Sequence, residues 1–354
     1  MASRRKRSVL AAGALTVVAL VAGVAVFRPR AQAASANLGE LTSVWVSEKT
    51  PTRSPLRAVC GPSSEPGVPA LAVGDDGVVL MRGVGGSWER AETPTKARLN
   101  AVANEHHESI AVGENGTIVR YDRQRRAWKQ DPSGTTEHLH AVATPRFNSS
   151  IAVGAHGTVL ELAGTEDGDR WRIVPVETKV DLFAVRVVND RFVVVGNEGT
   201  VLVSSRLDGR FDPLTFVVQK TPTTDPLRTI GTLAEGLMVG GPNGTLMTAV
   251  EDRPWTLTPT PISADVRAIE RVMLHRVIPL PSGREPVGKP FRALLPATVI
   301  VADDRLYVRA EAMPSFAELT TLAPPKGIVG VVETEAGLLA VTSHGGIWRL
   351  DDTK

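Results

Sequence analysis

The sequence predicts an all-β fold, a seven-bladed β-propeller built from four-stranded blades. Three observations predict it. A short pattern returns seven times with a period of about 40 residues, the repeated segments have the composition of β-strands, and incomplete units at the two ends of the chain complement each other. A fixed period of this size is typical of repeat architectures. The fold class therefore follows from the repeat rather than from any single motif.

The first strand of each unit is a Leu-x-Ala-Val segment. Clear copies stand at Leu56–Val59, Leu99–Val102, Leu139–Val142 and Leu182–Val185, and weaker copies at Leu227–Ile230, Val266–Ile269 and Ile328–Val331. The second strand is an apolar run before Gly-x-x-Gly, and the third follows that motif. The fourth begins at a bulky aromatic residue: Trp88, Trp128, Trp171, Phe216, Trp255 or Phe316. These runs are short, β-branched and bounded by Gly, Asp, Asn or Pro, which favours strands over helices.

The Gly-x-x-Gly segments are predicted to be tight turns between the second and third strands. Their central pairs include Asp75-Asp76, Glu114-Asn115, Ala155-His156, Asn197-Glu198 and Pro242-Asn243. Glycine permits the positive φ that such a turn needs, and Asp and Asn tolerate it. Two copies are degraded, since Ala302–Arg305 lacks the second Gly and Thr342–Gly345 lacks the first.

The two ends of the chain predict how the ring closes. Eleven residues separate Trp88 from Leu99, and counting back 11 residues from Leu56 reaches Trp45, a fourth strand with no first three strands before it. The last unit, from Ile328 onwards, has only three strands. The N-terminal strand is therefore predicted to complete the last blade, which leaves only short outer edges exposed. An open solenoid is the disfavoured alternative, because it needs polar capping units.

The N-terminal segment predicts export. Arg4–Arg7 precede a 19-residue apolar run over residues 9–27, which is followed by Arg28-Pro29-Arg30 and a small-x-small segment at residues 31–33. Residues 1–33 are therefore an export signal or an N-terminal membrane anchor, because the run is long for a cleaved signal and nearly long enough to span a bilayer. Residues 34–40 are a linker and 41–354 the propeller. In both cases the propeller is expected outside the cytoplasm, in the periplasm or at the cell surface.

Composition narrows the classes of function. The chain has 40 Lys and Arg against 38 Asp and Glu, a net charge of +2, which argues against a strong nucleic-acid binder. Its one cysteine, Cys60, allows no intramolecular disulfide and is interpreted as a small buried residue. No cofactor is expected.

The candidate site is the face that carries the Gly-x-x-Gly turns and the residues just before each first strand, around the central channel. Loops on a rigid scaffold often carry function. The candidate partner-binding residues are Arg57, Arg98, Arg228, Arg267, Asp75, Glu114 and Glu198. The arginines could bind an anionic group or an acidic segment of a partner. Alternatively, they pair with the turn carboxylates.

Two other features have open interpretations. His138, His140 and His156 belong to one unit and are weak candidates for a metal site, but the sequence offers no clear fourth ligand, so no metal is predicted. An insertion over about residues 272–296, rich in Pro and Gly, should form an extended loop on the face opposite the turns. It is either a partner-docking loop or a tolerated insertion.

The combined pattern, Leu-x-Ala-Val, Val-Gly-x-x-Gly-Thr and Gly-x-x-Trp, resembles the propeller family of the photosystem II assembly and stability factor and its bacterial relatives. The resemblance runs from Trp45 to Leu350 and is clearest over residues 99–128 and 139–171. It implies a non-enzymatic, extracytoplasmic protein-binding platform, an assembly or stability factor for a membrane or envelope complex. The membrane is a further partner if the N-terminal segment stays uncleaved.

A carbohydrate-binding or sialidase-like glycan-active propeller is the alternative. Gly86-Ser87-Trp88 and the segment over residues 167–171 are similar to eroded Asp-box turns. A sialidase needs a tyrosine nucleophile, however, and the only tyrosines, Tyr121 and Tyr307, are placed on third strands away from the channel. No enzymatic activity is therefore expected.

Overall fold

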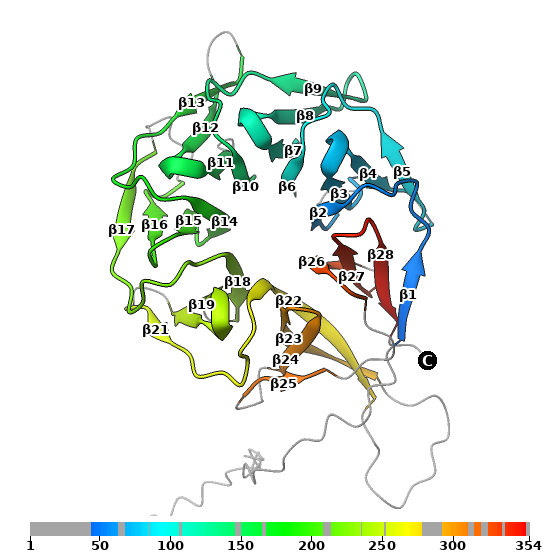
Figure 1. Cartoon of the computed structure of the whole chain (residues 1–354), viewed down its shortest axis with the longest axis vertical. Coiled ribbons are helices and arrows are strands. Elements are labelled where there is room, and N and C mark those ends of the chain that lie inside the picture. The colour runs from blue at the N-terminus through cyan, green and yellow to red at the C-terminus, as the bar shows by residue number, and fades with distance from the viewer. Residues whose placement is uncertain are drawn as a thin grey trace, which may run out of the picture. The chain divides into compact units, whose positions relative to one another are not determined.

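The protein is a ring of seven four-stranded antiparallel sheets (Figure 1). The computed structural model describes residues 44–62, 68–83, 85–105, 108–145, 150–164, 168–207, 214–234, 236–250, 253–277, 292–310, 315–319, 325–334 and 337–351. The predicted export signal or anchor and its linker lie outside these residues. In the part of the chain described, no helix is long and apolar enough to cross a membrane.

Each of the first three blades is a meander of consecutive strands. Blade 1 consists of β2 (Leu56–Cys60), β3 (Leu71–Gly74), β4 (Val79–Arg82) and β5 (Trp88–Ala91). Blade 2 consists of β6 (Leu99–Glu105), β7 (Glu108–Gly113), β8 (Ile118–Asp122) and β9 (Ala127–Asp131). Blade 3 consists of β10 (Leu139–Ala143), β11 (Ile151–Gly154), β12 (Val159–Ala163) and β13 (Arg170–Ile173).

The next three blades repeat this order. Blade 4 consists of β14 (Leu182–Val188), β15 (Arg191–Gly196), β16 (Val201–Ser204) and β17 (Phe216–Gln219). Blade 5 consists of β18 (Thr229–Leu233), β19 (Gly236–Gly240), β20 (Leu246–Ala249) and β21 (Thr256–Leu257). Blade 6 consists of β22 (Val266–Val277), β23 (Arg292–Ala302), β24 (Arg305–Ala310) and β25 (Ala317–Glu318). Tyr121 and Tyr307 lie on third strands, as predicted.

Blade 7 joins the two ends of the chain. It consists of β26 (Ile328–Thr334), β27 (Gly337–Thr342) and β28 (Ile347–Asp351), with β1 (Val44–Glu48) as its outer strand. Trp45 is opposite Leu350 in the antiparallel β1–β28 pair, and it is buried in the cluster shared by blades 6 and 7. The first strands also form a closed cycle of contacts, in which β26 touches β2. The predicted ring closure is confirmed.

The hydrophobic core lies between neighbouring blades. One cluster joins Leu71 and Val73 of blade 1 to Leu99 and Val102 of blade 2, and Cys60 packs against it. Cys60 was predicted to be buried and is half-buried, and the burial of its thiol raises its pKa to about 12. Because each sheet is covered on both faces by its neighbours, the inner strands are apolar runs rather than alternating ones.

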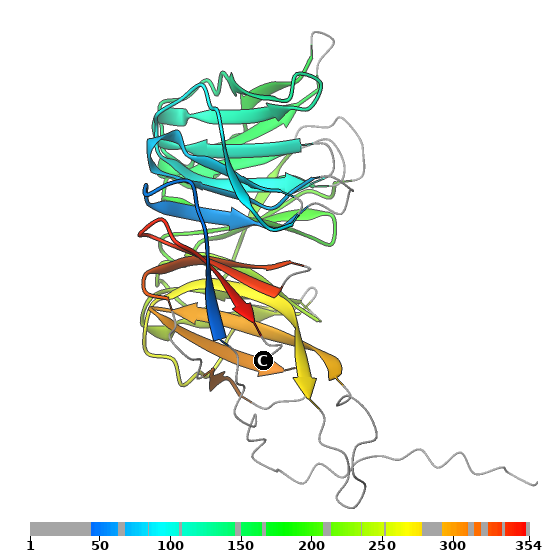
Figure 2. The same ribbon diagram turned by 90° about the vertical axis from the view of Figure 1, so that its right-hand side faces the viewer.

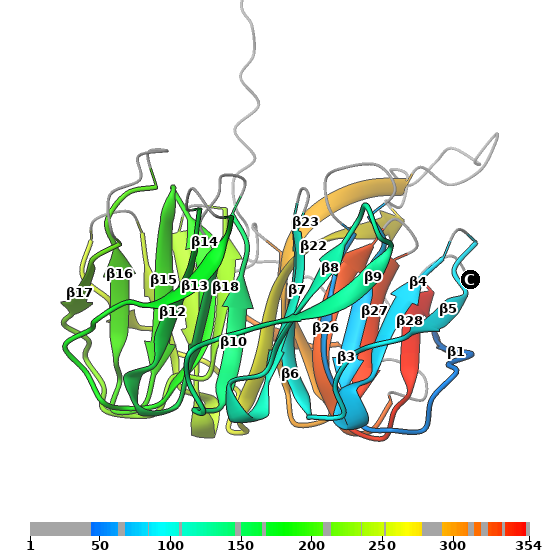
Figure 3. The same ribbon diagram turned by 90° about the horizontal axis from the view of Figure 1, so that it is seen from above.

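Four of the Gly-x-x-Gly segments form single turns of 3-10 helix, as Figure 3 shows along one face of the ring, and the blade 4 copy over residues 196–199 is a turn. The turns are η1 (Asp75–Gly77), η2 (Glu114–Gly116), η3 (Ala155–Gly157) and η4 (Pro242–Gly244). In η1 both Asp76 (φ 56°) and Gly77 (φ 63°) are left-handed, which confirms the predicted backbone. A Cβ on Gly77 would also collide with the carbonyl oxygen of Thr95, so glycine is required there.

The insertion in blade 6 is a longer hairpin than the sequence suggested. Strands β22 and β23 have 12 and 11 residues and pair without a break from Ala268↔Val301 to Val277↔Arg292. Figure 2 shows them extending beyond the strands of other blades. Much of the stretch predicted as a loop, about 272–296, is therefore β-ladder, because apolar and β-branched residues continue the strands. Residues 278–291 lie outside the described residues.

Candidate functional site

The candidate site is the inner rim, which comprises the second residue of each Leu-x-Ala-Val segment together with Arg98 and the carboxylates of the neighbouring turns. From blade 1 to blade 7 the second residue is Arg57, Asn100, His140, Phe183, Arg228, Arg267 and Val329. In six of the seven blades, the pairing of the first and second strands shifts register at this residue. A β-bulge re-aims a side chain and is common beside functional sites. The innermost strands surround the centre of the ring (Figure 1), and they carry these residues except Arg228, which directly precedes β18.

On blades 1 and 2 the charged residues form an alternating chain. Arg57 donates to both carboxylate oxygens of Asp75 at 2.8 and 2.9 Å. Arg98 lies 3.1 Å from Asp75 and 3.1 Å from Glu114. The hydrogen bond with Arg57 lowers the pKa of Asp75, and the same bond raises the pKa of Arg57. Here the pairing of arginines with turn carboxylates, one of the two interpretations of the sequence, is what the structure contains.

Blade 6 repeats this arrangement more weakly. Arg267 Nη2 lies 3.5 Å from Asp303 Oδ1, and both side chains are largely exposed. Such an exposed pair contributes little to stability. Glu198, the remaining acidic candidate, is exposed in the left-handed part of the blade 4 turn (φ 56°), and no ion pair between described residues includes it.

Arg228 of blade 5 is in a different environment. The residue that follows the first Gly in its own turn is Pro242, whereas Asp75 and Asp303 occupy this position in blades 1 and 6. Its guanidinium instead lies over the ring of Phe183, 4.9 Å from the centroid. Arg228 is therefore an exposed cation whose planar face is held by an aromatic ring rather than by a carboxylate.

An aromatic row continues from Arg228 across blades 4 and 3. The ring centroids of Phe183 and His140 are 5.7 Å apart. Burial lowers the pKa of His140, so this imidazole is neutral at neutral pH. Phe183 was not among the residues predicted for the site, although it occupies the same repeat position as Arg57. Comparing repeat positions, rather than selecting charged residues, would have found it.

The histidines have separate structural roles. Asn115 N–H in η2 donates to His138 Nδ1 at 3.1 Å. In the next turn the corresponding bond goes to an aspartate. His156 N–H donates to Asp181 Oδ1 at 3.0 Å, and Asp181 stands just before the first strand of blade 4. His138 thus links blade 2 to blade 3. The His156 ring lies 2.7 Å from Glu137, which raises the pKa of His156.

The three histidines therefore do not converge on one point. Among the described residues, no three His, Cys, Asp or Glu side chains are grouped to hold a metal ion.

Further along the first strands, one ion pair spans two blades that are not neighbours. Arg186 of β14 donates to Glu270 of β22 at 3.0 Å. The corresponding residue of blade 5, between them, is Gly231, which packs so closely on Ile269 that a side chain would collide with it. Burial raises the pKa of Glu270, and the charge of Glu333 acts in the same direction, whereas Arg186 opposes them. This pair was missed because neither residue belongs to a repeated motif.

Comparisons with known proteins support the fold. No protein-family model matches the sequence, and no curated protein is significantly similar to it. Among solved structures, YCF48 bound to D1 peptide matches with 13% identity and a TM-score of 0.61, over 88% of this chain and 97% of that one. YCF48 from Cyanidioschyzon merolae matches with 14% identity and a TM-score of 0.60, over 87% and 98%. The WD40 repeats of RRP9 match with 11% identity and a TM-score of 0.62, over 87% and 98%. The chain is similar to these proteins as a seven-bladed propeller.

Proposed function

We propose that this protein is a non-enzymatic platform that binds a subunit of a membrane or envelope complex outside the cytoplasm and assists its assembly or stability. The observation that carries the proposal is the row Arg228–Phe183–His140 on the inner rim. It presents aromatic surface on strands β10 and β14 and an exposed guanidinium directly before β18. Arginine and aromatic residues are enriched among the side chains that dominate protein interfaces.

The proposal rests on this row because other rim arginines are already in ion pairs with carboxylates. Arg57 and Arg98 already share Asp75, and Arg98 also pairs with Glu114, so a partner would have to displace existing ion pairs. Arg228 has no such pair with the described residues and offers its hydrogen-bond donors to an incoming carboxylate. Binding there adds a charge-assisted bond without breaking one.

The comparisons agree with a binding role. YCF48, a photosystem II assembly factor, has this architecture and has been solved with a D1 peptide. WD40 propellers share it as well. The rim carboxylates Asp75 and Glu114 are paired with arginines, an arrangement that suits a structural role more than glycoside hydrolysis by two placed carboxyl groups. We propose a protein-binding role of the same kind for this chain, but not the photosynthetic partner.

The location outside the cytoplasm is part of the proposal. It rests on the cluster Arg4–Arg7 followed by the apolar run over residues 9–27. A fusion of residues 1–40 to a reporter enzyme that is active only outside the cytoplasm should be active. An inactive fusion of normal abundance would contradict this part of the proposal alone.

Affinity capture of the full-length chain from detergent-solubilised membranes tests the binding role. We expect a stoichiometric complex with a membrane or envelope protein, lost when Arg228→Glu and Arg267→Glu are combined. Lys179→Glu, an exposed charge on the same face but away from the rim, is the matched control and should keep the complex. Retention on cell-wall polysaccharide with no protein partner would overturn the platform and favour the glycan-binding alternative.

A further inference from the structure

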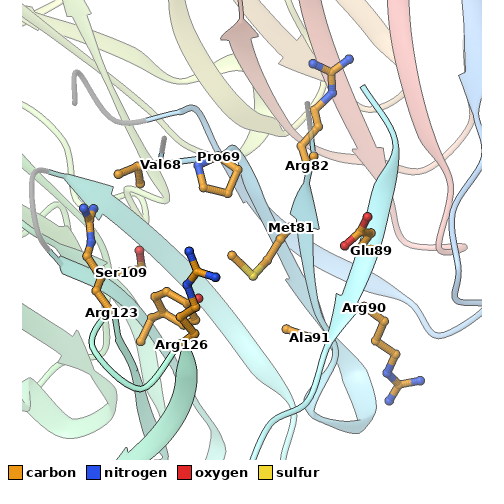
Figure 4. Close-up of a pocket in the computed structure, with 12 residues that line it drawn as sticks. Val68, Pro69, Met81, Arg82, Glu89, Arg90, Ala91, Ser109, Arg123 and Arg126 are labelled. Carbon is orange, nitrogen blue, oxygen red and sulfur yellow. The ribbon is translucent and has the colours of Figure 1, made fainter. Parts of the chain in front are cut away.

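A second candidate surface lies between blades 1 and 2, away from the inner rim. It is a cleft of about 720 Å³, drawn in Figure 4. Its walls are β4 and β5 of blade 1 and the β8–β9 hairpin of blade 2. The hairpins that join third to fourth strands lie at the opposite face from the 3-10 turns, because consecutive antiparallel strands alternate in direction. The cleft is therefore a different surface from the one proposed above.

The floor of the cleft is apolar and its margin is basic. Val68, Pro69, Met81, Ala91 and Tyr121 contribute the apolar part. Arg123 and Arg126 line it from the β8–β9 hairpin; Arg82 and Arg90 also line it, but their guanidinium groups extend away from Met81 in Figure 4, and the one acid in the lining is Glu89. The whole chain has a net charge of only +2, so this excess of positive charge is local. A volume of this size is within the range of about 300–1,000 Å³ that is usual for ligand sites.

The hairpin turn of blade 2 is built to present Arg126. Asp122 accepts hydrogen bonds from the backbone N–H groups of Gln124 and Arg125, both at 3.0 Å, and it pairs with the Arg125 side chain at 3.2 Å. Arg126 is exposed and has a left-handed backbone (φ 51°). Figure 4 shows its side chain and that of Met81 extending toward the same part of the cleft.

The charges of the cleft are only partly compensated. Arg82 is paired with Glu48 of β1 at 3.0 Å, yet its Nε is buried with no hydrogen-bond partner among the described residues. Neither Arg90 nor Arg126 is in an ion pair with any residue that the structure describes. Arg126, which is exposed, therefore keeps its hydrogen-bond donors for an incoming carboxylate.

We propose that this cleft binds an extended acidic segment of a partner protein. An apolar side chain of the segment rests on Met81 and Tyr121, and flanking carboxylates accept hydrogen bonds from Arg126 and Arg123. Guanidinium groups match carboxylates in a planar, two-bonded geometry. A concave, partly apolar cleft between two sheets suits a side chain better than a flat lipid surface. The inference adds a second docking surface to the proposed platform and does not depend on the inner rim.

Fluorescence anisotropy with the purified full-length chain tests the cleft. The probe is a labelled, acetylated peptide Asp-Leu-Asp-Phe-Glu, and its neutral analogue Asn-Leu-Asn-Phe-Gln is the comparison. We expect binding of the acidic peptide that weakens as salt increases, and at least about tenfold weaker binding of the neutral analogue. Arg126→Asn should weaken binding of the acidic peptide about fivefold or more, since asparagine removes the charge and still tolerates the left-handed backbone.

A matched variant shows where the peptide binds. Lys96→Asn removes one exposed charge from the opposite face and should leave the affinity unchanged. Equal losses in Lys96→Asn and in Arg126→Asn would overturn the cleft as the site. So would unchanged binding in Arg126→Asn. Binding of phosphatidylglycerol vesicles that depends on Arg126, without binding of the peptide, would overturn the peptide assignment in favour of a lipid surface.

Discussion

The inner rim and the inter-blade cleft both carry several arginines, but the two regions differ in how those arginines are neutralised. On the rim, Arg57 and Arg98 lie within 2.8 to 3.1 Å of Asp75 and Glu114 in a continuous chain. In the cleft, Arg126 projects from a turn whose one carboxylate, Asp122, is already bonded to Arg125 and to two backbone N–H groups. An arginine on a repeat scaffold is therefore available to a partner only where the local turn supplies no acid to hold it.

The same rule explains the variation within the rim. Arg57 and Arg267 have an aspartate at the start of their own Gly-x-x-Gly turn, whereas Arg228 has Pro242 there. Turn chemistry accepts Asp, Asn or Pro at this position, so the fold tolerates each of them. The blade in which proline replaced the acid is the one whose arginine stacks on Phe183. One turn residue thus decides whether a rim arginine is neutralised.

The largest expected effect is on the ring that supports both regions. Trp45→Ala should lower the free energy of unfolding by about 3–5 kcal/mol, because Trp45 is buried in the core shared by blades 6 and 7. Chemical denaturation of the full chain measures this. Val46→Ala, on the same strand but exposed, is the control and should change stability little. A stable Trp45→Ala variant would mean that β1 does not close the ring.

Asp75→Asn tests the rim arginines that are paired with a carboxylate. It leaves Arg57 and Arg98 without their shared carboxylate charge, and we expect a loss of about 1 kcal/mol at pH 7, because the pair is partly exposed. The folded pKa of Asp75 is lowered, so its contribution is complete above the unfolded pKa and disappears as pH falls through the folded pKa. The difference between wild type and variant should therefore shrink in acid. A difference that is constant between pH 7 and pH 2 would show that the charge is not involved.

The architecture could be predicted from the sequence because its signals are periodic. The spacing of 11 residues from Trp88 to Leu99 recurs across blades, and the orphan Trp45 obeys it, so strand order and closure followed without tertiary information. The possibility that rim arginines pair with turn carboxylates was also accessible, because both sit at fixed positions of one repeat. Which carboxylate each arginine pairs with could not be predicted, since this depends on how far side chains reach from one blade to the next.

The missed features depend on contacts that a repeat does not encode. Phe183 is apolar, whereas the candidate residues were selected for their charge. Its role follows from the position of Arg228, which comes from the next blade and lies over its ring. Arg186 and Glu270 meet across a blade because Gly231 has no side chain between them. Arg123 and Arg126 of the cleft come from the β8–β9 hairpin, which lies outside the repeated motif. Such contacts between blades can be recognised only from the three-dimensional arrangement of the blades.

Pro242→Asp gives Arg228 a carboxylate in its own turn, as Arg57 has in Asp75. The new carboxylate occupies the position that Asp75 has beside Arg57, and Arg228 should turn from Phe183 to it. Stability should change by less than about 1 kcal/mol, since the new pair is exposed. Capture of the membrane partner should fall toward the level of the variant that combines Arg228→Glu and Arg267→Glu. Pro242→Asn provides the uncharged control, because asparagine stands at this position in blade 4. Equal capture by both variants would show that neutralising Arg228 does not matter.

The smallest expected effect is on the turn that presents Arg126 to the cleft. A left-handed backbone is unfavourable for an ordinary side chain and is better tolerated by asparagine. Arg126→Asn should therefore raise the free energy of unfolding slightly, by roughly 0.5 kcal/mol. Arg125→Asn, the neighbouring residue, loses the ion pair with Asp122 and should be neutral or slightly destabilising. Denaturant titrations of the two variants side by side separate these effects. A variant that is more stable yet binds the acidic peptide less tightly shows that Arg126 is retained for binding rather than for the fold, whereas destabilisation by Arg126→Asn would indicate a structural role for this arginine.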